Sequence, residues 1–83
     1  MTLEILTPEK RLYSGDVYGV QLPGIDGKFE VLNRHAALVS ALGKGTVKVI
    51  TDKNTTTNFR IESGFIEVLN NKATVLVEGA TEI

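Results

Sequence analysis

The chain has 83 residues, of which 42% are apolar and 23% are charged, and it has no cysteine. This length and composition predict one small globular domain over residues 1–83, and they exclude a second domain, a disulfide framework and a thiolate zinc site. Nine Lys and Arg against ten Asp and Glu give a formal net charge of −1, which argues against binding to nucleic acid or to an anionic membrane surface.

The first part of the chain alternates apolar and polar residues, as a strand does when one face is buried. We expect a strand over Thr2–Ile5, which Pro8 ends because proline cannot donate to a strand ladder. A second short strand is expected over Arg11–Tyr13, followed by a turn at Ser14–Asp16.

The middle of the chain is less regular. The run Val17–Leu22 spaces its apolar residues by three and then by two, which predicts a β-bulge near Gly19. The turn formers of Pro23–Gly27 predict a loop, and a strand follows over Lys28–Leu32. In Asn33–Leu42 the alternation fails, so no regular strand is expected there.

Regular alternation returns in the second half, with a turn expected at Asp52–Asn54 and a two-residue type I′ turn at Asn70–Asn71, because Asn tolerates positive φ. Further strands are expected over residues 46–51, 55–62, 65–69 and 72–78.

Eight to ten short strands joined by Gly, Asn and Asp turns predict an all-β domain, a two-sheet β-sandwich or flattened barrel around one core. The longest apolar stretch, Ala36–Val39, is far too short to span a bilayer. The N-terminus lacks the basic region of a signal peptide. We therefore expect no direct membrane insertion.

The sequence offers little for catalysis. His35 is the only histidine, and we interpret it as a loop or interface residue because nothing places a nucleophile and an acid beside it. The glycines lack the spacing of dinucleotide or phosphate-binding loops. We expect no catalytic residue, no cofactor and no metal.

Two resemblances bear on function. The segment Thr51–Asn54 resembles the hairpin tip on which lipoyl domains carry their modified lysine, and it makes a carrier domain with Lys53 at the tip the alternative hypothesis. The segments SGDVYGVQLPGIDGKFEVLNRHAALVSALGKG (residues 14–45) and SGFIEVLNNKATVLVEGA (residues 63–80) resemble the epsilon subunit of F-type ATP synthases. Order and spacing match that family across essentially the whole chain.

Four departures from the family pattern lie in or near the middle segment. Glu30 and Arg34 stand where the family usually has Gly, Ala37 replaces a Pro, and Gly43-Lys44 replaces Lys-Pro. The family's second domain, an α-helical hairpin, would begin about where this chain ends. The resemblance therefore covers the β-sandwich alone.

The resemblance implies a noncatalytic subunit of the central stalk, bound to the gamma subunit and to the membrane c-ring. It implies a hetero-oligomer, peripheral to the cytoplasmic face of the bacterial inner membrane, that couples rotation to ATP synthesis. For gamma it implies contacts through Thr7, His35, Ala36, Ala37, Leu38, Val39 and Leu42. For the c-ring it implies contacts through Asp26, Gly27, Lys28 and Phe29.

The segment His35–Leu42 leaves two readings open, because a strand exposes every second residue and cannot bury an unbroken apolar run. It is either a loop that fills the core or a patch that binds a partner.

Overall fold

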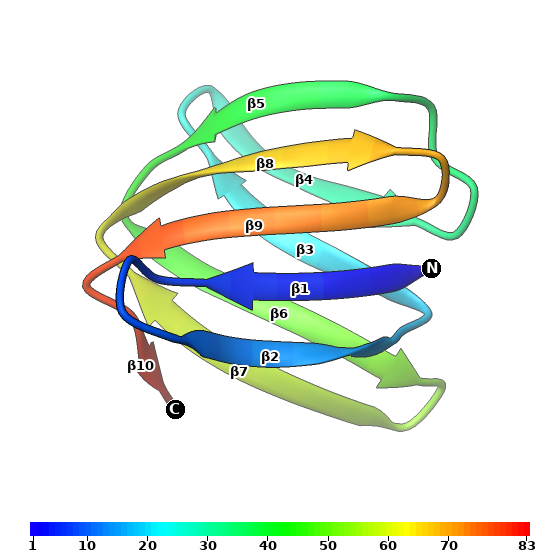
Figure 1. The fold of residues 1–83 in the computed structure, drawn as a ribbon, viewed down its shortest axis with the longest axis horizontal. Coiled ribbons are helices and arrows are strands. Elements are labelled where there is room, and N and C mark those ends of the chain that lie inside the picture. Colours follow the sequence, from blue (N-terminus) through cyan, green and yellow to red (C-terminus); the bar gives the residue numbers. More distant parts are fainter.

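A computed structural model describes all 83 residues, which form ten β-strands and no helix (Figure 1). The strands are β1 (Thr2–Leu6), β2 (Arg11–Asp16), β3 (Gly19–Gly24), β4 (Gly27–Leu32), β5 (Leu38–Leu42), β6 (Gly45–Asp52), β7 (Thr55–Ile61), β8 (Ser63–Leu69), β9 (Lys72–Glu78) and β10 (Thr81–Glu82). The prediction of an all-β domain is confirmed. No helix that could cross a membrane is present.

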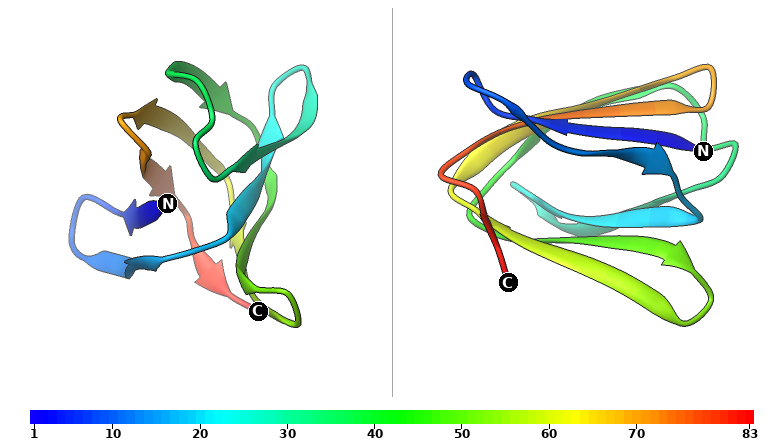
Figure 2. Two further views of the ribbon diagram at one scale, coloured as in Figure 1. Left: turned by 90° about the vertical axis from the view of Figure 1, so that its right-hand side faces the viewer. Right: turned by 60° about the horizontal axis from the view of Figure 1, so that its bottom comes forward.

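The strands form one hydrogen-bonded sheet that curls over into two layers (Figure 2). Along the sheet the order is β10-β7-β6-β3-β5-β8-β9-β1-β2, with β4 added to β3. We call β5, β8, β9, β1 and β2 the β8 layer, and β4, β3, β6, β7 and β10 the β6 layer. A single residue pair, Gly24 with Leu42, joins the layers between β3 and β5. The expected sandwich is thus confirmed, as one sheet folded on itself.

Both layers contribute to one core of 17 buried apolar residues. In the β8 layer, Leu3 and Ile5 of β1 alternate with outward residues and lie beside Ala73 and Val75 of the parallel strand β9. The β6 layer contributes residues such as Val49, which is also fully buried. Neither layer could bury its inward face without the other, so the two fold as one unit.

The hairpin prediction at Asn70–Asn71 is confirmed. Asn70 has φ 52° and Asn71 has φ 60°, and the two residues join β8 to β9 as a type I′ turn requires. The turn at Asp52–Asn54 is also present, with Lys53 and Asn54 at its tip and a register shift between Ile50 and Asp52.

The expected turn at Ser14–Asp16 is wrong. These residues continue β2 and pair with β1, with Gly15 opposite Leu3, because pairing to a buried strand outweighs the turn preference of Ser, Gly and Asp. The chain reverses instead at Val17–Tyr18. The expected bulge near Gly19 is also wrong. Val17 lies in the connection before β3, and β3 begins at Gly19 and pairs in regular register with β4 and β6.

The expectation of no regular strand in Asn33–Leu42 is wrong for its second half. Residues Leu38–Leu42 form β5, which pairs with β8 along its whole length. The alternation is hidden because Ser40 points toward the core side while Val39 and Ala41 point outward. The inward face of β5 thus contains a polar residue between Leu38 and Leu42, and its outward face is apolar, so the strand lacks the usual alternation.

Three smaller differences concern strand ends. The loop expected at Pro23–Gly27 narrows to Ile25–Asp26 between β3 and β4, and the break expected at Ser63-Gly64 lies one residue earlier, at Glu62. The short strand β10, which pairs Thr81 with Arg60 of β7, was not expected.

Gly64 should be intolerant of a side chain. A Cβ at this position would overlap the backbone oxygen of Leu76 and lie 3.2 Å from Val77 Cγ1. Gly64→Ala should lower the free energy of unfolding by about 1–3 kcal/mol, as overpacking of a rigid core does.

Gly15→Ala is the control, since its Cβ would meet only the Tyr13 ring at 3.6 Å or more. It should change stability by less than about 0.5 kcal/mol. Urea unfolding of both variants checks the pair, and equal losses would contradict the packing of β8 against β9.

Candidate partner-binding site

The residues expected to contact gamma are divided between the two ends of the sandwich. His35, Ala36 and Ala37 are exposed in the β4–β5 loop, at the end that also holds the N-terminus. The His35 ring bonds through Nδ1 with the backbone oxygen of Ala36 at 2.8 Å. Arg34, which replaces a glycine of the family pattern, has φ 66°, a conformation that glycine adopts without strain.

Strand β5 carries the rest of that segment along the edge of the β8 layer. Val39 points outward and is 71% exposed, while Leu42 is 2% exposed and belongs to the core. Leu38 is half-buried and packs against the core. Val39 and Ala41 therefore lie on the outward face of the strand, and Leu38 and Leu42 lie on the face that packs in the core.

Thr7 lies at the opposite end of the sandwich from His35, in the β1–β2 turn. Its hydroxyl oxygen accepts the Lys10 N–H at 3.1 Å and the Glu9 N–H at 3.3 Å. The fold brings Thr7 to one side of a shallow groove of about 460 Å³, which Leu42 and Phe65 also line. Thr7 is thus close to the end of β5, although 35 residues separate them in sequence.

The residues expected to contact the c-ring form the β3–β4 hairpin. Asp26, Gly27 and Lys28 are exposed at its tip, and Phe29 is half-buried against the core. The hairpin adjoins Ser40 and Ala41 of β5 across a small hollow. The hairpin therefore lies beside the end of β5 that holds Leu42, whereas His35, Ala36 and Ala37 lie at the other end of the sandwich.

An apolar row that the sequence analysis missed crosses the outer face of the β8 layer. Ala41 pairs with Phe65, Phe65 with Leu76, and Leu76 with Leu6, so that four neighbouring strands each place one apolar side chain side by side. Phe65 is 57% exposed and Leu76 is 51% exposed. We call Ala41, Phe65, Leu76, Leu6 and the adjacent Val39 the outer apolar row.

The signal for this row was present in the sequence. In β8 and β9 the residues Ile66, Val68, Val75 and Val77 already supply the buried face, so an apolar residue in the opposite phase has no role in the core. Exposed apolar patches of this kind mark interaction sites.

The outer face of the β6 layer is different. Its central row consists of Glu30, Gln21, Lys48 and Asn58, which pair in register across β4, β3, β6 and β7. Gln21 Nε2 donates to Glu30 Oε2 at 3.0 Å. The central row on this outer face is thus polar, whereas the corresponding row of the β8 layer is apolar.

Charged side chains border the outer apolar row. Glu4 lies one row away on β1, and its carboxylate oxygens are 3.5 Å from Arg11 Nη2 and 3.6 Å from Lys72 Nζ. The two cations neutralise this acid beside the apolar residues, which gives the polar rim typical of protein interfaces.

His35 and Lys53, the two side chains considered for chemistry, lie in different loops. His35 has no hydroxyl or carboxylate as a hydrogen-bond partner, and no three His, Asp or Glu side chains gather where they could hold a metal ion. Lys53 is exposed at the tip of the β6–β7 hairpin, a position that a carrier lysine would also occupy.

Comparison with known proteins gives a consistent picture. Residues 1–83 match the family described as ATP synthase, Delta/Epsilon chain, beta-sandwich domain. The chain is 43% identical over 76 residues to the ATP synthase epsilon chain of Chlorobium limicola, with 92% of this chain and 86% of that protein covered. It is 41% identical over 81 residues to the ATP synthase epsilon chain of Protochlamydia amoebophila, with 98% of this chain but 55% of that protein covered. The chain thus spans most of one relative and about half of the other.

Two solved structures share the fold. A chain of the Euglena gracilis mitochondrial ATP synthase (OSCP/F1/c-ring in rotational state 1) superposes with a TM-score of 0.89 at 18% identity, covering 96% of this chain and 51% of that chain. A chain from the central stalk/c-ring structure of the Tetrahymena thermophila mitochondrial ATP synthase gives 0.84 at 20% identity, covering 98% and 65%. At such identities the likeness concerns the fold.

Val39 faces outward from β5 and Leu42 faces the core. Placing a charge at each position tests directly which residues of this strand are free for a partner. Val39→Glu should change the free energy of unfolding by less than about 0.5 kcal/mol, because the side chain is already in solvent. Leu42→Glu should lower the free energy of unfolding by several kcal/mol, because it buries an unpaired carboxylate. Thermal unfolding, monitored by circular dichroism, checks both variants. A similar large loss of stability in both would place the whole segment in the core.

Proposed function

The chain belongs to the ATP synthase delta/epsilon chain β-sandwich domain family, and on that premise we propose that it is a noncatalytic subunit of the central stalk of an F-type ATP synthase. In this role it binds the gamma subunit and the c-ring and couples their rotation to ATP synthesis in the catalytic head. Family membership and the relatives favour this function over the lipoyl-type carrier with Lys53. The hetero-oligomer would be peripheral to the cytoplasmic face of the bacterial membrane.

The observation that carries the proposal is the outer apolar row. Its residues are not needed for the core, they lie on adjacent strands, and an aromatic residue, Phe65, is at the centre. Interface cores favour aromatic and apolar residues and few charges. We propose that this face, with Thr7 at its border and the His35–Ala37 loop at its far end, binds gamma.

The second contact is the β3–β4 hairpin. Its exposed tip carries Asp26 and Lys28, which suit the polar loops of a c-ring better than an apolar surface would. Lys28 favours an acidic residue on the facing ring loop, because complementary charges fix the register of an interface. The closely packed core beneath both surfaces gives the rigidity that transmission of torque demands.

Substitution at the centre of the row tests the gamma contact. Phe65→Glu should weaken binding to the cognate gamma subunit by at least about tenfold, since a central aromatic residue is a typical hot spot. Thr56→Glu adds the same charge on the outer face of the β6 layer, and it should bind as the unsubstituted domain does. Calorimetric titration checks both, and equal affinities for the two variants would contradict the assignment of this face.

A cross-linking experiment tests the c-ring contact. A cysteine that replaces Lys28 should cross-link to ring subunits in the assembled complex, because the hairpin tip extends from the sandwich toward the ring. Lys53→Cys is the matched control, as it lies on an exposed hairpin tip at the opposite end. Cross-linking from position 53 and not from position 28 would reverse the proposed orientation.

A further inference from the structure

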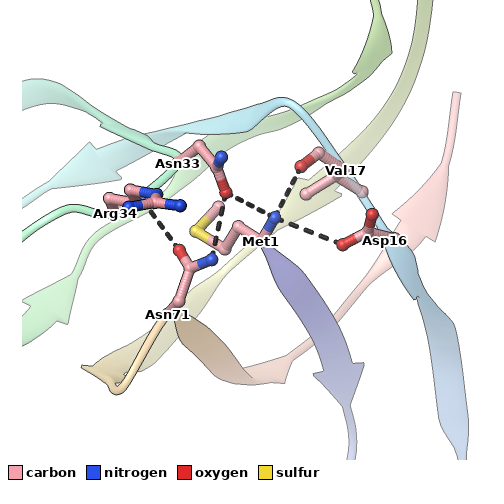
Figure 3. A network of polar contacts seen from close by, with 6 residues as sticks. All are labelled: Met1, Asp16, Val17, Asn33, Arg34 and Asn71. Atoms are coloured by element: carbon pink, nitrogen blue, oxygen red, sulfur yellow. Dashed lines mark hydrogen bonds and ion pairs between the residues drawn. The ribbon is translucent and has the colours of Figure 1, made fainter.

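Three segments that are distant in sequence meet around Met1 at one end of the sandwich (Figure 3). The Met1 nitrogen lies 2.7 Å from Asn33 Oδ1, in the β4–β5 loop. It is also 3.2 Å from the Val17 oxygen and 3.2 Å from Asp16 Oδ1, at the β2–β3 connection. The β8–β9 hairpin supplies the third segment, through Asn71.

The side chain of Asn71 uses both ends of its amide in this junction. Its Oδ1 accepts the backbone N–H of Arg34 at 2.7 Å, and its Nδ2 donates to Asn33 Oδ1 at 3.1 Å. One side chain on the β8–β9 hairpin thus holds two successive residues of the β4–β5 loop.

The residue that Asn71 holds is in an unfavourable backbone conformation. Arg34 has φ 66°, and the left-handed region costs a non-glycine residue free energy relative to its usual conformations. Such a conformation persists only where the surroundings fix it.

The remainder of the loop has only local hydrogen bonds. The His35 N–H donates to the Leu32 oxygen at 3.1 Å, and the His35 ring bonds with the Ala36 oxygen. The bond from Arg34 to Asn71 is therefore the one hydrogen bond that ties residues 34–37 to another part of the sheet. Because β4 ends at Leu32 and β5 begins at Leu38, the exposed residues 34–37 have this one hydrogen bond to another segment between the two strands.

We propose that Asn71 is a positioning residue that fixes the conformation of the Arg34–Ala37 loop and so determines how this loop contacts gamma. The second half of this inference rests on the proposed function, whereas the first half does not. Asn71 suits the task twice, since it tolerates the positive φ of the type I′ turn and offers both a donor and an acceptor.

The two roles of Asn71 can be separated by substitution. Asn71→Gly keeps a residue that adopts positive φ easily but removes the amide. Asn70→Gly is the matched control, because it makes the same change in the same turn and the Asn70 side chain forms no hydrogen bond within the protein. Asn71→Asp retains an acceptor for the Arg34 N–H and loses the donor to Asn33.

The first measurement is amide hydrogen exchange by NMR. Asn71→Gly should speed the exchange of the Arg34 amide by about tenfold or more, as expected for loss of one hydrogen bond that resists local opening. Asn70→Gly should leave this rate unchanged, and Asn71→Asp should restore part of the protection, because it keeps the acceptor for Arg34 but loses the donor to Asn33. Unchanged Arg34 exchange in Asn71→Gly, or no rescue by Asn71→Asp, would overturn the role of Asn71.

The second measurement is the dissociation rate from gamma, followed by surface plasmon resonance with the same variants. Asn71→Gly should dissociate severalfold faster than Asn70→Gly. Asn71→Asp should dissociate more slowly than Asn71→Gly, because it keeps the acceptor for the Arg34 N–H. Faster Arg34 exchange without faster dissociation would overturn the link between the loop and gamma. Failure of the unsubstituted domain to bind gamma would instead overturn the proposed function. The exchange measurement does not involve gamma, so it would still test whether Asn71 positions the loop.

Discussion

The burial of every second residue against one shared core is the constraint on which the other features of this protein depend. Each strand has one phase that faces the other layer and one phase that faces outward. The inward phase is filled by Val, Ile and Leu at almost every position, and the core contains no buried polar or charged residue. The core therefore does not use the side chains of the outward phase, and an apolar residue found there is available to a partner.

The two layers differ in the polarity of their outward residues. The outward phase of the β6 layer is polar along its central row, whereas that of the β8 layer carries Phe65 and Leu76 beside Leu6 and Ala41. The β3–β4 hairpin adjoins the end of this row across Ser40 and Ala41. One sandwich thus offers an apolar face and a polar tip next to each other, and this arrangement supports the proposal that it contacts two neighbours.

Much of this fold could be predicted from the sequence because most strands have clean alternation. The β8–β9 hairpin was predictable in detail, since Asn70–Asn71 supplies the positive φ that the turn needs. The prediction failed where pairing outweighs local preference, as at Ser14–Asp16, which β1 holds in a strand. It failed again at β5, where Ser40 takes an inward position and Val39 an outward one.

The site was less predictable than the fold, for a physical reason. The resemblance indicated the β4–β5 segment and the β3–β4 tip. Local pattern can also mark an apolar residue in the outward phase of a strand, but which of these residues lie side by side depends on the register among four strands. The contact between Asn71 and Arg34 joins residues 37 positions apart. The residue type of Arg34 gave no signal for its left-handed conformation, because arginine seldom adopts it, although the family pattern has a Gly at this position.

Methyl NMR of the isotope-labelled domain, with and without its cognate gamma subunit, tests the central claim most directly. The account predicts that the methyl signals of Leu6, Val39 and Leu76 shift or broaden on binding, while those of Ile50 on the outer face of the β6 layer do not. Perturbation confined to Ile50 and its neighbours, or none at all at saturating gamma, would contradict the assignment of the β8 layer as the face that binds the stalk.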